Sequence, residues 1–338
     1  MTFDETRAVL TRVAWLYYIE QLSQQEIADR LRLSRVKVTR LLQRARDEKI
    51  VEVRIADANA PWQALERRLV QRFGLRDAVV MPSEAGERLR RHLGQAAAAY
   101  LERILRAGDV VGIGSGATLS EIPDFIGRGP HPRCLVVELI GGLSRTDRGV
   151  NPYDCSWRLA EALDARSEHL QVPAMVESAG IVDILLGDSV TRAALERAAS
   201  CDIAFVGVGQ MDSPIRATMD YVPRPVLDRL AAAGAVGDIL LRFFDAAGRQ
   251  VPAEFDEQVI GLTLDQLRRV PLVVGVAGGL EKTRAIAGAL HGGLVDVIIC
   301  DQATAAAVLA EPDAAPGAGV AAAQTGKEKE HALRANAP

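Results

Sequence analysis

The most constraining feature of the sequence is the stretch between residues 23 and 46, which predicts two short helices joined by a tight turn. Ser23 is followed three residues later by Glu26, the spacing of a capping box that satisfies backbone N–H groups at a helix start. Ser34 offers the same kind of cap to a second helix. This pattern indicates a helix-turn-helix, so we expect a DNA-binding domain.

The second predicted helix gathers its cations on one side. Apolar residues from Val38 to Ala45 recur at helical spacing and leave the basic side chains on the exposed surface. In a helix-turn-helix the second helix enters the major groove, where its first residues meet base edges while neighbouring groups hold phosphates. We predict Arg35, Lys37 and Arg40 as base readers within a DNA-binding set of Gln24, Gln25, Ser34, Arg35, Lys37, Thr39, Arg40 and Arg44.

The alternative is a solvated basic helix without function, which the agreement of cap, turn and basic face disfavours. Upstream, apolar residues from Val9 to Ile19 recur at helical spacing and predict a supporting amphipathic helix. Downstream, residues 50–55 alternate as a short strand or wing would. We therefore expect the DNA-binding domain to span residues 1–56.

The remainder of the chain requires a second domain, because 338 residues with 49% hydrophobic content exceed what a single small domain can bury. The net charge of −4 excludes a general electrostatic coat for nucleic acid and favours local DNA contacts near the N-terminus. No apolar run reaches the roughly 18 residues of a membrane span, and residues 1–12 lack a signal-peptide core. We expect a cytoplasmic protein with no membrane contact.

The four cysteines and five histidines give no sign of a metal site. Cys134, Cys155, Cys201 and Cys300 are far apart and mostly lie in or beside apolar runs, which predicts buried thiols. The histidines form no His-x-x-x-His pair and have no carboxylate cluster beside them. We therefore expect neither metal nor cofactor.

From residue 57 to 310, strand-like and helical runs alternate. Strands that are apolar on both faces favour a largely parallel α/β sheet, whose ligands sit beyond the carboxyl ends of the strands. Residues 311–338 are rich in alanine and charge and predict a disordered tail. The predicted strands lie at residues 78–81, 110–113, 135–140, 203–208, 272–277 and 295–300, and the helices near 87–106, 152–163, 188–200, 223–233 and 280–290.

A glycine-rich loop at residues 112–118 follows a predicted strand and precedes a predicted helix. Its glycines allow close backbone approach, its N–H groups attract negative charge, and Ser115 and Thr118 add hydroxyls, which suits phosphate. The alternative is that glycine serves only the tight turn. Gly141 and Gly142 end the next strand, and Gly278 and Gly279 precede Lys282.

Lys282 is predicted in a first helical turn, where the helix dipole gives an ammonium no advantage, so we infer an anionic ligand. The alternative is a surface lysine beside a carboxylate. The glycine loop also fits the loose dinucleotide fingerprint, with Glu138 about 20 residues further on. Glu138 is predicted inside a strand and not at its tip, so we rank NAD below a sugar phosphate.

These residues carry a resemblance that covers nearly the whole chain: it resembles the SorC-type sugar-responsive transcriptional regulators of bacteria. The matching motifs are the Ser-Gln-Gln-Glu-Ile-Ala stretch from Ser23, Asn-Pro-Tyr-Asp from Asn151 with Arg-Leu-Ala from Arg158, Gly-Ala-Val-Gly-Asp-Ile from Gly234 with Arg-Phe-Phe-Asp from Arg242, and Gly-Val-Ala-Gly-Gly from Gly275 with Lys282.

The resemblance implies a Rossmann-like α/β effector domain similar to ribose-5-phosphate isomerase and glucosamine-6-phosphate deaminase. It also implies a sugar, polyol or sugar-phosphate effector that changes operator affinity, and a homo-oligomer, either dimer or tetramer. The effector-binding residues that it implies are Gly114, Ser115, Gly116, Ala117, Thr118, Gly141, Gly142, Asn151, Gln210, Asp238, Lys282 and Asp301.

One departure concerns the ligand, because relatives that grip phosphate often have two threonines where this chain has Ala117 and Thr118. Either Ser115 supplies the missing hydroxyl or the ligand is a neutral sugar or polyol. An isomerase-like enzyme is the rival function, and it needs a positioned carboxylate base. The acidic stretch of the isomerases is absent after the strand at residues 203–208, and Asp202 precedes that strand. We therefore predict a regulator and no catalytic residue.

The helix predicted from Trp62 to Phe73 follows the DNA-binding domain. Its position suits a role in transmission or dimerisation, but its apolar stripe is equally explained by ordinary core packing. The predicted mechanism is linkage, in which ligand and operator change each other's affinity through one coupling free energy. Paired DNA-binding domains would require operator half-sites of matching twofold symmetry.

Overall fold

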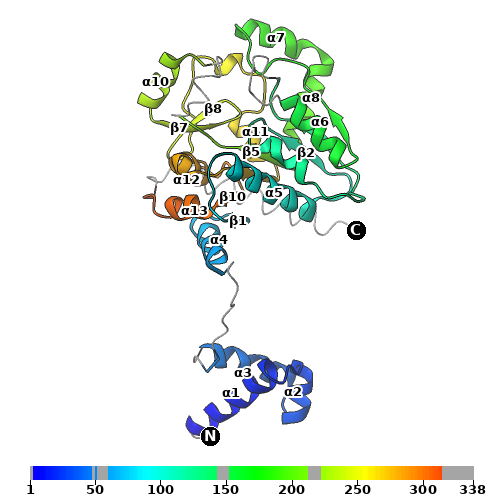
Figure 1. The fold of residues 1–338 in the computed structure, drawn as a ribbon, viewed down its shortest axis with the longest axis vertical. Helices are drawn as coiled ribbons and strands as arrows, with labels where there is room; N and C mark the ends of the chain where they lie inside the picture. Colours follow the sequence, from blue (N-terminus) through cyan, green and yellow to red (C-terminus); the bar gives the residue numbers. More distant parts are fainter. Residues whose placement is uncertain (1–2, 48–49, 52–59, 143–151, 212–221, 314–338) are drawn as a thin grey trace. The chain divides into compact units, whose positions relative to one another are not determined.

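The computed structural model describes residues 3–47, 50–51, 60–142, 152–211 and 222–313. The chain forms two compact units, Met1–Ala60 and Pro61–Pro338. In the first unit α1 (Phe3–Tyr18), α2 (Gln24–Leu31) and α3 (Arg35–Asp47) share one small core (Figure 1). That core contains Leu10, Val13, Ala14, Leu16, Ile27, Ala28, Val38, Leu41, Leu42 and Ala45.

The helix-turn-helix is confirmed together with the predicted caps. The Ser23 hydroxyl accepts the Glu26 N–H at 3.3 Å, and the Glu26 carboxylate accepts the Ser23 N–H at 2.7 Å. The Ser34 hydroxyl likewise accepts the Lys37 N–H at 3.3 Å at the start of α3. Between the helices Arg32 adopts a left-handed conformation with φ 51°, which ends α2.

Two details of this unit differ from the sequence prediction. Ile19 was predicted on the buried face of the first helix, but α1 ends at Tyr18, so Ile19 lies beyond it and is 61% exposed. Ile50 and Val51 pack against the core without forming a strand, and the rest of the predicted wing lies outside the described residues.

The second unit is built on a seven-stranded parallel sheet, so the predicted fold class is confirmed. The strand order is β1-β10-β9-β5-β2-β3-β4. All six predicted strands are present, with bounds that differ by at most two residues. They are β1 (Asp77–Met81), β2 (Val110–Ile113), β3 (Leu135–Glu138), β5 (Ile203–Gly207), β9 (Leu272–Val276) and β10 (Val297–Asp301), and β4 (Arg166–Glu168) joins them at one edge.

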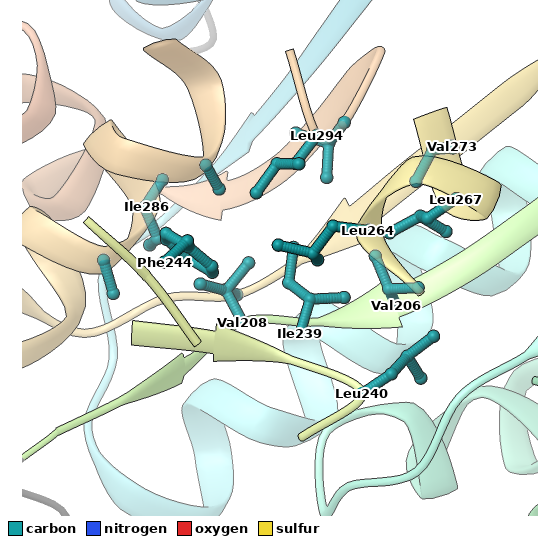
Figure 2. Close-up of a cluster of buried hydrophobic side chains, with 14 of the residues drawn as sticks. Val206, Val208, Ile239, Leu240, Phe244, Leu264, Leu267, Val273, Ile286 and Leu294 are labelled. Atoms are coloured by element: carbon teal, nitrogen blue, oxygen red, sulfur yellow. The ribbon is translucent and has the colours of Figure 1, made fainter. Parts of the chain in front are cut away.

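Side chains alternate between the two faces of the sheet, and each face has its own core. Ile203 and Phe205 of β5 face a cluster under α5 (Gly86–Ile104), the 3₁₀ helix η1 (Leu119–Phe125) and α6 (Pro152–Ala162). Ala204 and Val206 face the larger cluster, part of which appears in Figure 2. That cluster is covered by α4 (Ala60–Phe73), α8 (Ser189–Ala199), α10 (Arg224–Ala232), α11 (Leu264–Arg269), α12 (Thr283–His291) and α13 (Gln302–Val308).

A small antiparallel sheet lies beyond the end of β5 and was not predicted as strands. It consists of β6 (Gly209–Gln210), β7 (Ala235–Ile239) and β8 (Arg242–Asp245). Its inner side chains, among them Ile239, Leu240 and Phe244, join the larger core (Figure 2). The remaining elements are α7 (Ala179–Gly187), η2 (Asp256–Gln258) and η3 (Leu280–Lys282). None of the described helices is both long and apolar enough to cross a lipid bilayer.

Candidate functional site

The surface of α3 carries the predicted base readers. Arg35, Lys37 and Arg40 are exposed, whereas Val38 and Leu42 on the opposite side are buried in the core. This division follows from the helical period, which places the apolar positions on one face. The exposed face therefore presents three cations within the first two turns of the helix.

The other predicted DNA-binding residues have partners within the unit. The Thr39 hydroxyl donates to Gln24 Oε1 at 2.8 Å and joins the start of α2 to α3. Gln25 donates to Asp29 at 3.0 Å along the outside of α2. The Ser34 hydroxyl is engaged as the cap, and Arg44 is exposed near the carboxyl end of α3.

The sequence prediction did not include Val36, which is 63% exposed in the first turn of α3. An apolar side chain in that position suits contact with a thymine methyl group in the major groove. Its signal was present in the sequence, because Val36 falls outside the buried stripe that begins at Val38.

The glycine loop lies where the sheet reverses its order of connection. From β2 the chain proceeds to β3 and β4 on one side and then returns to β5 on the other. Ligands of open α/β sheets bind at such a switch point, outside the carboxyl ends of the strands. The Gly114 N–H donates to Phe205 O at 2.9 Å, so the loop begins directly against β5. Residues 115, 116 and 118 are partly exposed and Ala117 is exposed.

A second part of the candidate site is the β6–β7 ladder, which pairs Gly209 with Asp238 and Gln210 with Gly237. Asp238 is only 7% exposed, and its Oδ2 accepts the Leu241 N–H at 3.2 Å. The turn from β7 to β8 holds Leu240 at φ 54° and Leu241 at φ 61°, a rare conformation for residues other than glycine.

The same turn reaches the glycine loop. A Cβ built on Gly114 would lie 3.1 Å from Leu240 Cδ2, so the leucine side chain packs directly against the start of the loop. Leu240 is also part of the larger core (Figure 2). The strained turn thus fixes the carboxylate of Asp238 relative to the glycine loop.

The third part is the turn between β9 and α12, in which Gly279 has φ 106°. Lys282 ends the short 3₁₀ helix η3 and immediately precedes α12, so it lies one residue before the helix and not within its first turn, where the sequence predicted it. The Asp301 carboxylate is 2% exposed and holds this turn by accepting the Gly279 N–H at 3.0 Å. Burial raises the pKa of Asp301, but hydrogen bonds from Thr304, Gly279 and Ser83 outweigh it and lower the pKa.

Gly141 and Gly142 have backbone roles. The Gly141 N–H donates to Ile260 O at 3.0 Å, and the Gly142 N–H donates to Val172 O at 2.8 Å. A Cβ on Gly141 would lie 2.6 Å from Val172 O, so only glycine permits this approach. Asn151, also predicted as an effector contact, lies outside the described residues.

The structure thus gathers three predicted groups at one edge of the sheet: the loop 114–118, the strands of Gln210 and Asp238, and the turn of Lys282. A cavity of about 560 Å³ adjoins two of them and is lined by Gln210, Glu281 and Thr283. The loop 114–118 does not line it. The strand order alone places the loop 114–118 at the switch point, on the ligand-binding edge of the sheet.

The residues of the rival predictions have other roles. Glu138 is 3% exposed, and its carboxylate accepts hydrogen bonds from Ser156 at 2.7 Å and from Leu170 N at 2.8 Å, besides contacting His169 Nδ1 at 2.9 Å. It therefore points into the protein and not toward a ribose. Asp202 accepts the Val110 N–H at 2.9 Å at the amino end of β2, opposite to the ligand edge. Among the described residues no group of three His, Cys, Asp or Glu could hold a metal ion.

Comparisons with known proteins give a consistent result. A model of the Sugar-bind family, a sugar-binding domain, matches residues 57–310. The transcriptional regulator LsrR of Klebsiella pneumoniae is 36% identical over 309 residues, covering 89% of this chain and 93% of its own. LsrR of Escherichia coli K12 is 34% identical over 307 residues, with 89% and 94% covered. The full-length sorbitol operon regulator SorC from Klebsiella pneumoniae aligns with TM-score 0.71 and 29% identity over 90% of this chain and 99% of that chain.

Proposed function

The chain belongs to the SorC family of transcriptional regulators. From this premise we propose that it binds an operator through α3. We also propose that its operator affinity changes when a sugar-derived ligand binds to the second unit. The observation that carries the proposal is the joining of two modules in one chain. A helix-turn-helix with exposed cations precedes a domain that matches a sugar-binding family over residues 57–310. Its relatives are named as regulators and not as enzymes.

In the proposed DNA complex, Arg35, Lys37 and Arg40 reach base edges, and Val36 meets a thymine methyl group. Gln24 and Thr39 act through their mutual hydrogen bond, which keeps the start of α2 against α3. The test is selection of bound fragments from a random DNA library by the full chain. Enrichment of an inverted repeat supports the proposal, whereas uniform recovery of all sequences would contradict it.

For the effector we propose a ligand with an anionic group at the loop 114–118 and Lys282, and hydroxyls toward Gln210 and Asp238. The support is the position of the loop at the switch point and the lysine at the neighbouring turn. Asp301 then acts as a positioning residue, because its buried carboxylate holds the Gly279 turn. Gly141 and Gly142 act by allowing close packing of the chain.

Thermal unfolding against pentoses, hexoses and polyols, each free and phosphorylated, tests the ligand class. A ligand that binds only the folded state raises the unfolding temperature. Shifts confined to phosphorylated compounds support the anionic site. Shifts with neutral polyols would contradict it and identify Ala117, which lacks a hydroxyl, as the residue that distinguishes this chain from phosphate binders.

We also propose that the chain acts as a homo-oligomer in the bacterial cytoplasm, where its operator would lie. Exposed apolar side chains support this on each unit: Trp15 and Ile19 on the first, and Ile184 and Val190 on the second. Sedimentation velocity at micromolar concentration tests it. A mass twice or four times that of the chain is expected, and a monomer would contradict the proposal.

A further inference from the structure

We propose that α4 carries the state of the effector site to the DNA-binding unit, and that Trp62 and Arg72 make this connection by holding the two ends of α13. The inference rests on the proposed function, because it assigns a regulatory route to the same site.

The route begins at the buried Asp301 carboxylate, which links three segments. It accepts the Gly279 N–H at 3.0 Å, the Ser83 hydroxyl at 2.9 Å and the N–H of Thr304 at 3.2 Å. Ser83 in turn accepts the Ala303 N–H at 2.8 Å. The turn that leads to Lys282 therefore cannot shift unless α13 moves with it or a buried carboxylate loses its donors, which is costly.

Helix α4 holds the amino end of α13 through Trp62. The indole N–H donates to Gln302 Oε1 at 3.1 Å, and Gln302 directly follows Asp301 in the chain. The carboxylate that fixes the effector-site turn and the side chain that α4 contacts thus belong to adjacent residues. A shift of the turn at Gly279 is therefore transmitted to Trp62 through Asp301 and Gln302 alone.

The carboxyl end of α13 is held by Arg72. Its guanidinium donates to Leu309 O at 2.6 Å, Val308 O at 3.4 Å and Glu311 O, and it pairs with Asp313 at 2.8 Å. Such contacts satisfy the carbonyls that a helix end leaves without intrahelical donors, and they place a cation at the favourable end of the dipole. Helix α4 thus contacts α13 at both of its ends.

Helix α4 begins at Ala60, the last residue of the first unit, and continues from Pro61 into the second, so the covalent connection to the DNA-binding unit enters the second unit at the start of α4. The centre of α4 is anchored, because Leu69 is buried in the larger core and Glu66 accepts the Val80 N–H of edge strand β1 at 2.8 Å. The apolar side of α4 therefore packs into the larger core. Trp62 lies only two residues from the start of the helix, where a change in α13 has the shortest path to the linker.

The first experiment needs no ligand and uses hydrogen exchange of the full chain. The variant Asp301→Asn replaces one acceptor oxygen by a donor, and the milder Ser83→Ala removes a single hydroxyl from the same cluster. Both should speed exchange at residues 60–66 of α4 at least threefold while leaving β2 and β3 unchanged. Unchanged exchange in α4, or an equal increase throughout the second unit, would overturn the inference.

The second experiment titrates inorganic phosphate and compares Trp62→Phe with the matched control Trp157→Phe, which alters an exposed tryptophan on α6. In the wild type and the control, phosphate should slow exchange at both the turn 278–282 and α4. In Trp62→Phe it should slow exchange only at the turn. If phosphate slows exchange at the turn of the wild type but not in α4, the inference is overturned, although the anion site still stands. Absence of protection at the turn would contradict the anion site, and the ligand-free experiment would then decide the inference.

Discussion

Arg32 occupies the turn between α2 and α3 with φ 51°, and its side chain is exposed. A left-handed conformation costs a residue with a Cβ about 1–2 kcal/mol, a cost that glycine does not bear. Replacing Arg32 with Gly removes this cost and loses no buried side chain. The glycine also makes the unfolded chain more flexible, which offsets about 0.4–1 kcal/mol of the gain. The net expectation is about 0.5–1 kcal/mol of added stability for the DNA-binding unit.

The assay is hydrogen exchange at the buried amides of α2 and α3 in the full chain, because exchange reports local opening of this unit alone. A gain of about 0.5–1 kcal/mol corresponds to roughly two- to fivefold slower exchange. The matched control is Arg30→Gly, two residues earlier. It places glycine inside α2 and breaks the 2.9 Å ion pair with Glu20, so exchange should accelerate. Faster exchange in Arg32→Gly would refute the account of this turn.

Three further outcomes follow from the same structure. Arg40→Ala should weaken operator binding by about 1–3 kcal/mol and relax the base preference at one position, measured by fluorescence anisotropy; unchanged specific binding would remove Arg40 from the readers. Lys282→Ala should raise the phosphorylated effector concentration needed for half response and leave any neutral ligand unaffected. Hydrogen bonds lower the pKa of Asp301 in the folded protein. Its ionised form therefore stabilises the fold at pH values above the ordinary aspartate pKa, and this stabilisation is lost as the pH falls through the lowered pKa of the folded state. The difference in thermal midpoint between wild type and Asp301→Asn should therefore narrow below about pH 4, and a constant difference would contradict the assignment.

The parallel sheet was predictable because its inner strands are apolar on both faces, as in residues 203–207. Four other strands, β4, β6, β7 and β8, carried no such signal. β4 is the polar sequence Arg-Ser-Glu at the sheet edge, and β6 has only two residues. The β7–β8 hairpin turns through Leu240 and Leu241, so neither glycine nor asparagine marked the turn in the sequence. Its conformation is fixed by tertiary packing against the core and the glycine loop.

The candidate site was predictable where the chemistry follows a strand end, as at the loop 114–118 and at Lys282. The sequence could not reveal which polar groups would be occupied by the protein itself. Asp301 follows the same strand-end pattern, yet its carboxylate is engaged by donors from Ser83, Gly279 and Thr304, which come from three separate segments. Such partners become visible only when the fold brings distant segments together.

The most direct test of the account is the operator affinity of the full chain, measured with and without each sugar, polyol and sugar phosphate at fixed salt. Linkage predicts that one chemical class changes this affinity, typically by about 5–150-fold, and that operator DNA changes the affinity for that compound by the same factor. A compound that binds the second unit at saturation and leaves operator affinity unchanged would contradict the proposed coupling.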